Sequence, residues 1–164
     1  MLKATISGTL PEIEEIDFSD AMKKIGEYMV KSIQRTFLQA GRPEAWVALR
    51  GVQETPLISS GRLFKSINFK ADARSVEIST GSGIPYARIH QFGGRVPISD
   101  KSRGFFWFMF KQTGAEKWKY MALSKQASFK IPARPYMEFQ DSDIVFIKET
   151  LLGHAYKLIK SQKI

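Results

Sequence analysis

Residues 19–40, with the sequence SDAMKKIGEYMVKSIQRTFLQA, contain the pattern that decides the fold. Apolar side chains recur there at steps of three and four residues, at Met22, Ile25, Met29, Ile33 and Phe37. Because an α-helix has about 3.6 residues per turn, this spacing places them all on one face. The pattern predicts an amphipathic helix roughly 30 Å long, enough to span a small domain.

The residues on either side set the limits of this helix. Ser19 or Asp17 can cap its first turn. Gly41 accepts the left-handed conformation that follows many helices, and Pro43 pushes Arg42 out of helical space. We therefore expect the helix to end near residue 40.

A second long helix is predicted over residues 141–160. Asp141 or Ser142 can cap its start. Its apolar face would carry Ile144, Ile147, Leu151, Ala155 and Leu158.

Shorter elements are predicted between the two helices. A turn at residues 59–61 precedes one helical turn around Leu63 and Phe64. Apolar and polar residues then alternate over 67–70 and 75–79 on either side of a polar turn at 71–74, which predicts a hairpin. Residues 86–92 are expected to form a short helix that Gly93 and Gly94 end.

A long aromatic and basic excursion follows, at about residues 95–130. It contains six consecutive large apolar residues, Phe105 to Phe110, which predict a strand covered on both faces. Together the elements predict one α+β domain over residues 1–164, with two long helices packed on a small, mainly antiparallel sheet.

Composition agrees with a folded domain and excludes several kinds of site. The chain has 164 residues, of which 43% are hydrophobic and 25% charged, and a formal net charge of +9. The absence of cysteine excludes thiol nucleophiles, disulfides and iron–sulfur clusters, and two histidines are too few for a multi-histidine metal centre. No stretch reaches the roughly 20 apolar residues that span a bilayer, and no secretory pattern is present at the start, so we expect a soluble protein that stays in the cytoplasm.

The charges are unevenly distributed along the chain. Residues 11–20 contain five acids and no base, whereas residues 95–134 contain nine bases and two acids. Such asymmetry suits subunits that meet acidic surface to basic surface. The alternative is a solvated face that keeps the protein soluble.

Candidates for catalysis are weak. A serine hydrolase would need His90 or His154 as its base, and neither lies near a Gly-x-Ser-x-Gly motif. The glycines at 81 and 83 lack the lysine and hydroxyl of a phosphate loop, which favours a structural turn. We expect His90 to be a hydrogen-bonded packing residue and His154 to lie at the surface or its boundary.

A nucleic-acid-binding module is a second hypothesis. The aromatic run lies close to Lys101, Arg103 and Lys111, a combination that binders of single strands use for stacking and for neutralising phosphates. Stacking platforms, however, place aromatic residues at alternate positions of an exposed sheet face, and an unbroken apolar run favours a core or a subunit interface.

Several segments in a fixed order carry a family resemblance. They are Arg42, Pro43 and Trp46; Pro56-Leu57-Ile58; Ser60-Gly61-Arg62-Leu63; Ser66-Ile67; Pro85-Tyr86-Ala87-Arg88-Ile89-His90-Gln91-Phe92-Gly93; and Ile131-Pro132-Ala133-Arg134-Pro135-Tyr136. In this order they resemble the phage virion morphogenesis family, the tail-completion proteins of contractile-tailed phages, which are similar in turn to the head–tail joining neck proteins of siphophages. The excursion from Gly94 to Lys130 is longer than expected of shorter members.

The resemblance implies a non-enzymatic structural protein without a cofactor, which finishes the tail and helps to join it to the DNA-filled head. From the uneven charges we further expect copies of the protein to assemble as a ring and to contact other tail or head-connector proteins. Any contact with DNA is expected to be non-specific, and no contact with membranes is expected. The expected location is the virion tail or neck, after assembly in the host cytoplasm. The candidate fold-motif or assembly residues are Arg62, Tyr86, Arg88, His90, Phe92, Gly93, Pro132, Arg134, Pro135 and Tyr136, and the candidate basic interface is Lys117, Lys119 and Lys125.

The prolines and arginines of the motif suit such a role. Pro132 and Pro135 fix backbone torsions around Arg134 and so stiffen an extended segment. Arg62, Arg88 and Arg134 can each offer several donors to a carboxylate or to backbone carbonyls. The sequence leaves open whether these bonds lie within one subunit or between subunits.

Overall fold

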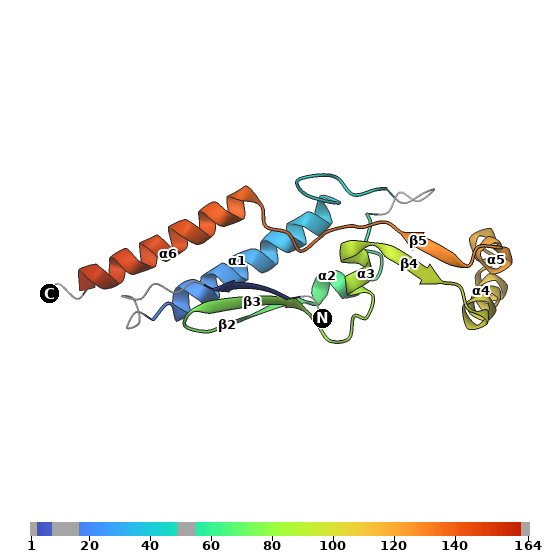
Figure 1. The fold of residues 1–164 in the computed structure, drawn as a ribbon, viewed down its shortest axis with the longest axis horizontal. Coiled ribbons are helices and arrows are strands. Elements are labelled where there is room, and N and C mark those ends of the chain that lie inside the picture. Colours follow the sequence, from blue (N-terminus) through green and yellow to red (C-terminus); the bar gives the residue numbers. More distant parts are fainter. Residues whose placement is uncertain (1–2, 8–16, 49–54, 162–164) are drawn as a thin grey trace.

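A computed structural model describes residues 3–7, 17–48 and 55–161 of the chain (Figure 1). The elements in order are β1 (Lys3–Ser7), α1 (Ser19–Leu38), α2 (Arg62–Lys65), β2 (Ile67–Ala71), β3 (Ser75–Thr80), α3 (Ala87–Phe92), β4 (Gly94–Pro97), α4 (Asp100–Thr113), α5 (Glu116–Leu123), β5 (Ser128–Ile131) and α6 (Asp141–Ser161). The fold class α+β is confirmed. None of the described helices is both long and apolar enough to cross a membrane.

Helix α1 is the long amphipathic helix that the sequence predicts. The whole predicted apolar stripe, from Met22 to Phe37, is buried. The residue at its N-cap is Phe18, and not Ser19 or Asp17 as predicted. Asp17 still contributes at this end, because its Oδ1 accepts a hydrogen bond from the Ser19 N–H at 2.8 Å. Gly41 follows the helix with φ +118°, in the region that favours glycine.

A three-stranded antiparallel sheet lies against α1, in the order β1-β3-β2. The predicted hairpin is β2–β3, and its turn is held by Asp72, whose Oδ1 accepts from the backbone N–H groups of Arg74 and Ser75. Helix and sheet approach closely at Gly26, where an added Cβ would lie 2.1 Å from the ring of Phe69. A glycine in the middle of α1 therefore makes room for an aromatic side chain of β2.

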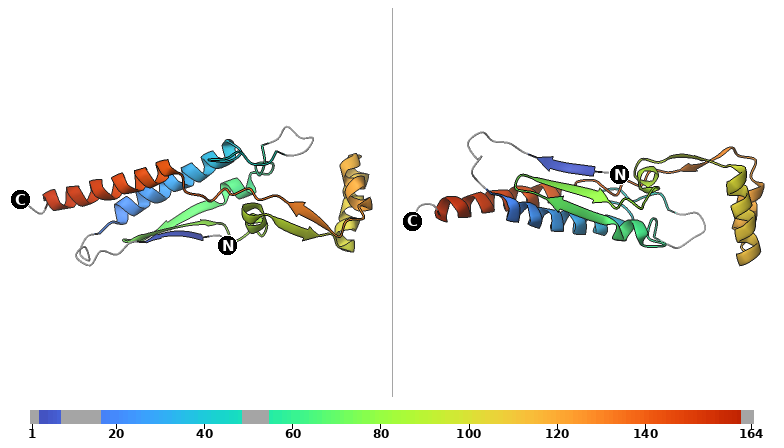
Figure 2. Two further views of the ribbon diagram at one scale, coloured as in Figure 1. Left: turned by 45° about the horizontal axis from the view of Figure 1, so that its top comes forward. Right: turned by 90° about the horizontal axis from the view of Figure 1, so that it is seen from below.

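Helix α6 packs antiparallel on α1, and Figures 1 and 2 show the two long helices side by side. Ser32 donates to the buried Asp143 at 2.7 Å, Tyr28 stacks on Phe146 with ring centroids 3.7 Å apart, and the ring of His154 is 2.8 Å from the Asp17 carbonyl oxygen. The second long helix is thus present, but it packs mainly on α1.

Two details of the second helix differ from the prediction. Its start is closed by Asp143, whose Oδ2 accepts from the Gln140 N–H at 2.9 Å, and not by Asp141 or Ser142. Ile144, expected on the buried face, is 43% exposed. The reason is that the polar Asp143 points towards α1 and turns Ile144 to the edge of the contact.

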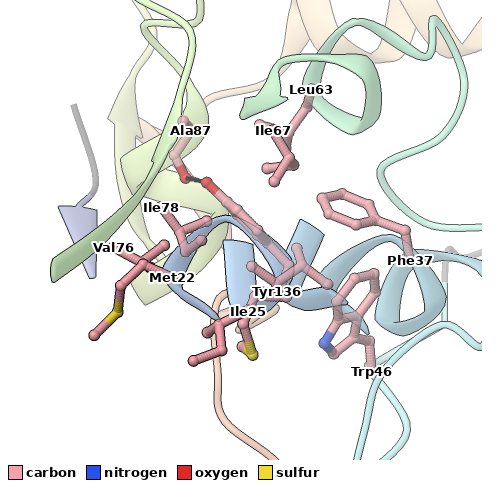
Figure 3. Close-up of a cluster of buried hydrophobic side chains, with 12 residues drawn as sticks. Met22, Ile25, Phe37, Trp46, Leu63, Ile67, Val76, Ile78, Ala87 and Tyr136 are labelled. Carbon is pink, nitrogen blue, oxygen red and sulfur yellow. Dashed lines mark hydrogen bonds between the residues drawn. The ribbon is translucent and has the colours of Figure 1, made fainter. Parts of the chain in front are cut away.

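The core is formed by buried side chains of α1, of the three-stranded sheet and of segments later in the chain (Figure 3). Phe37 of α1 lies against the rings of Trp46, Phe64 and Tyr136, with centroids 5.0–5.8 Å apart. Tyr136 is fully buried although it lies in an irregular segment. Residues after the excursion therefore complete the core formed by residues before it.

The excursion forms an arm that projects from this body (Figures 1 and 2). Strands β4 and β5 pair antiparallel as its stalk, and α4 and α5 pack on each other at its far end. The strand predicted over residues 105–110 is wrong, since these residues lie inside α4. Ser99 caps that helix by accepting from the Ser102 N–H at 3.2 Å, and Gly114 ends it with φ +66°.

Candidate functional site

The two ends of the arm are bound together at its base. We call residues 86–93, which include α3, and residues 131–137 the anchor. The Arg134 N–H donates to the His90 carbonyl at 2.8 Å. The Gln91 side-chain oxygen accepts from the backbone N–H groups of Tyr136, at 3.0 Å, and Met137, at 3.1 Å. The Tyr136 hydroxyl donates to the Ala87 carbonyl at 3.3 Å (Figure 3).

Gly93 is required where the two segments of the anchor approach each other most closely. Its φ is +69°, and an added Cβ would lie 2.7 Å from the Ala133 nitrogen and 3.0 Å from the Ile131 oxygen. No side chain fits between these backbones. The Gly93 of the family motif therefore allows α3 to meet the returning chain.

Arg134 and its neighbouring prolines connect the anchor to the body. The guanidinium is buried and donates from Nε and one terminal nitrogen to the Val47 carbonyl, at 3.3 and 3.0 Å. The indole N–H of Trp46 donates to the Pro135 carbonyl at 3.0 Å. These bonds lie within one chain, so in this structure Arg134 ties the body to the segment that Pro132 and Pro135 stiffen. Burial lowers the pKa of Arg134 from its ordinary value.

His90 is a packing residue of the anchor, but its predicted hydrogen bond is missing. Its ring lies edge-on to Tyr86, with centroids 5.7 Å apart. The buried Nδ1 has no hydrogen-bond partner among the described residues. Burial, and secondarily the charge of Arg134, lower the pKa of His90. The cause is that α3 turns the ring inward against apolar and cationic neighbours instead of an acceptor.

The remaining motif residues face solvent. Arg88 is exposed on α3, Phe92 is 63% exposed at its end, and Arg62 is exposed on α2. These side chains are available for contacts with other molecules, unlike Gly93, Arg134 and Tyr136.

The far end of the arm, residues 99–127, is called the head. Its helices are held together by Phe106, which stacks on Trp118 with centroids 6.1 Å apart and contacts Phe129 of the stalk. Arg103 donates from one terminal nitrogen to the carbonyls of Ala122, at 2.9 Å, and Ser124, at 2.6 Å. The head therefore has a small aromatic core of its own.

The outside of the head is apolar as well as basic. Phe105 and Phe108 on α4, and Tyr120 and Leu123 on α5, are each more than half exposed. The lysines at 101, 111, 117 and 125 are exposed beside them. Large exposed apolar groups rimmed by charges mark interaction surfaces.

The candidate basic interface lies on the head. Lys117 and Lys119 are on α5, and Lys125 is in the segment between α5 and β5. Lys119 forms an ion pair with Glu116 at 3.5 Å, and Lys117 lies 5.4 Å from the ring centroid of Trp118. The acidic segment that would meet such an interface, residues 11–20, lies outside the described residues except for 17–20, where Asp17 and Asp20 are exposed.

Gln91 and Asp143 are two important buried polar residues that the sequence did not indicate. Gln91 lies inside the motif, and its position among inward-facing residues of a short helix is the signal that could have found it. Asp143 lies at the third position of α6, where an acid can close a capping box. Within the described ranges, no three His, Asp or Glu side chains gather as metal ligands do.

An α+β body with an anchored arm, whose head is apolar and basic, defines a protein with a surface suited to contacts with other macromolecules. The model of the phage virion morphogenesis family matches residues 10–155, and this chain belongs to that family. It is similar to the Mu-like prophage FluMu G protein 2 of Haemophilus influenzae, with 30% identity over 139 residues that cover 85% of this chain and 79% of the relative. No solved structure matches the chain at a significant level.

Proposed function

We propose that this chain is a structural protein, and not an enzyme, that completes the tail of a phage or prophage and helps to join the tail to the DNA-filled head. It would assemble with further copies of itself, as a ring or partial ring at the end of the tail, and contact other tail or head-connector proteins there. Its place would be the tail or neck of the virion, after assembly in the host cytoplasm. Membership in the phage virion morphogenesis family and similarity to a Mu-like prophage protein support this role.

The observation that carries the proposal is the exposed head at the end of an anchored arm. Phe105, Phe108, Tyr120 and Leu123 present apolar surface to solvent on α4 and α5. Figure 2 shows these two helices at the far end of the arm, away from the body. Exposing such groups costs free energy in a protein that acts alone. Burial against a neighbouring subunit would recover it, while the lysines would select an acidic partner surface.

A charge-reversal experiment tests this role. We expect the triple variant Lys117→Glu, Lys119→Glu and Lys125→Glu to leave heads and tails intact but to reduce their joining in an in vitro complementation assay. The matched control reverses Lys23, Lys31 and Lys70, which are exposed on α1 and β2 and change the net charge equally. Equal joining by both variants and the native chain would contradict the electrostatic part of the proposal.

A nucleic-acid-binding module remains a second candidate, because the aromatic residues of the head are exposed beside lysines. The helical conformation of residues 105–110 frees Phe105 and Phe108 for stacking. Size-exclusion chromatography with light scattering, with and without a short DNA, separates the two roles. Self-association, with DNA binding that moderate salt removes, would support assembly; stoichiometric DNA binding that survives moderate salt would favour the module.

A further inference from the structure

Helix α6 is apolar on two opposite faces. One face contacts α1 and the core through half-buried Ile147 and Leu151. The other carries Val145, Leu152 and Tyr156, which are 53%, 71% and 69% exposed. A helix with apolar residues on both sides is normally covered on both sides.

Helix α1 provides the comparison within the same chain. Its solvent face carries Lys23, Glu27 and Lys31, as expected of a helix with one buried face. The outer face of α6 therefore differs from an ordinary solvated face of this protein.

The first half of α6 and the exposed residues just before it are acidic. We call the exposed side chains of residues 138–152 the acidic face. Its charged members are Glu138, Asp141 and Glu149, against a single base, Lys148. Its apolar members are Phe139, Ile144, Val145 and Leu152. Apolar groups rimmed by acids would fit a partner that is apolar and basic.

The head of the arm has this complementary character. Phe105 and Phe108 are exposed on α4 between Lys101 and Lys111. Helix α4 has 14 residues, or about 20 Å at 1.5 Å per residue, which matches the length of the helical part of the acidic face. Figure 1 places the head and α6 towards opposite ends of the long axis, so the two elements do not meet within one chain.

We infer that the head of one copy docks on the acidic face of the next copy. The contact is heterologous, because unlike surfaces meet, and it repeats head to tail into a ring or a filament. This inference rests on the proposed self-assembly, and it identifies the acidic face as the surface that the head binds. Phe105 and Phe108 cover Val145 and Leu152, while the lysines of the head lie against Glu138, Asp141 and Glu149.

Cysteine cross-linking tests this contact cleanly, since the chain contains no cysteine. One sample carries Gln112→Cys on α4, another carries Lys148→Cys on α6, and the two are mixed with a short bismaleimide linker. We expect this pair to cross-link about tenfold more than either variant alone. It should exceed by the same factor a mixture of Gln112→Cys with Ser82→Cys, which lies at an exposed loop position.

Charge reversal on the same samples tests the electrostatic part of the contact. Asp141→Lys with Glu149→Lys on the α6 sample should abolish the cross-linked product, and Lys101→Glu with Lys111→Glu on the head sample should restore it.

Light scattering on the same samples separates the inference from the proposed function. If the protein self-associates but the mixed pair cross-links no more than the controls, the docking surface is wrong and self-assembly stands. Preferential cross-linking of Lys148→Cys to itself would show that α6 pairs with α6, which also overturns the inference. A monomer at every concentration, without cross-links, would overturn both.

Discussion

Replacing Gln91 by methionine should destabilise the whole chain, because one side-chain oxygen holds two backbone N–H groups of the anchor. Tyr136 is fully buried and Met137 half-buried, so the substitution leaves one donor wholly and one partly without a partner. An unpaired buried donor costs about 1–3 kcal/mol, which gives a loss of roughly 2–4 kcal/mol for the pair. For a chain of this size, the midpoint of thermal unfolding should fall by roughly 5–15 °C.

Urea unfolding followed by circular dichroism measures the loss, and hydrogen exchange of the Tyr136 and Met137 amides locates it. The matched control is Gln39→Met, at an exposed position, which should change stability by less than about 0.5 kcal/mol. Gln91→Glu keeps an acceptor and should preserve protection of both amides. A loss below about 1 kcal/mol in Gln91→Met, with exchange at Tyr136 unchanged, would refute the argument that Gln91 holds the anchor.

Three further predictions concern the body and the pH dependence. A change of glycine to alanine normally stabilises a helix, but Gly26→Ala should lower the free energy of unfolding in urea by about 1–3 kcal/mol, because the new Cβ would overlap the ring of Phe69. A variant more stable than the native chain would contradict this. Thermal stability should be highest above pH 6.5, the ordinary pKa of histidine, and should fall as the pH drops below it. The reason is that burial lowers the pKa of His90, so the unfolded chain binds a proton that the folded chain does not. His90→Gln should flatten this slope in thermal melts recorded from pH 5 to 8. Asp143→Ala should lower the free energy of unfolding by about 2 kcal/mol, since the Ser32 hydroxyl and the Gln140 N–H lose their acceptor, whereas Asp141→Ala at an exposed position should have little effect.

Local patterns in the sequence predicted most of the body, because α1, α6 and the β2–β3 hairpin each have their signal in consecutive residues. Strand β1 (Lys3–Ser7) was not predicted. The stripe from Met22 to Phe37 has helical spacing by itself, and the structure buries it along α1. The Asp72 turn and the Gly93 stop also act over a few residues, and the structure confirms the hairpin and the short helix beside them.

The head was mispredicted because a continuous apolar run has no period to distinguish helix from strand. Phe106 points into the head while Phe105 and Phe108 point out, a pattern that exists only once α5 packs on one side of α4. The signals that define α4 are its ends, the Ser99 cap and Gly114. Those two ends favour a helix over the residues between them.

The anchor could not be predicted as a site, because its bonds join residues more than forty positions apart. The Gln91 oxygen meets the Tyr136 N–H across 45 positions, and Arg134 meets the Val47 carbonyl across 87. The sequence indicated that Gln91 and Arg134 belong to a motif, but not that the two halves of the motif bind each other. Only the closed arm brings them together.

This closure gives the family motif a physical role. Its two best-defined segments, residues 85–93 and 131–136, flank the arm and bind each other at the arm's base. At this base Gly93 has no space for a side chain, and Tyr136 is fully buried. A two-stranded ribbon alone is only marginally stable in water, so the stalk of the arm depends on what fixes its ends. With the ends fixed, the length and surface of the excursion can differ without disturbing the core. The motif residues therefore determine where the arm leaves the body, whereas the docking that we propose depends on the exposed Phe105, Phe108 and lysines of the head.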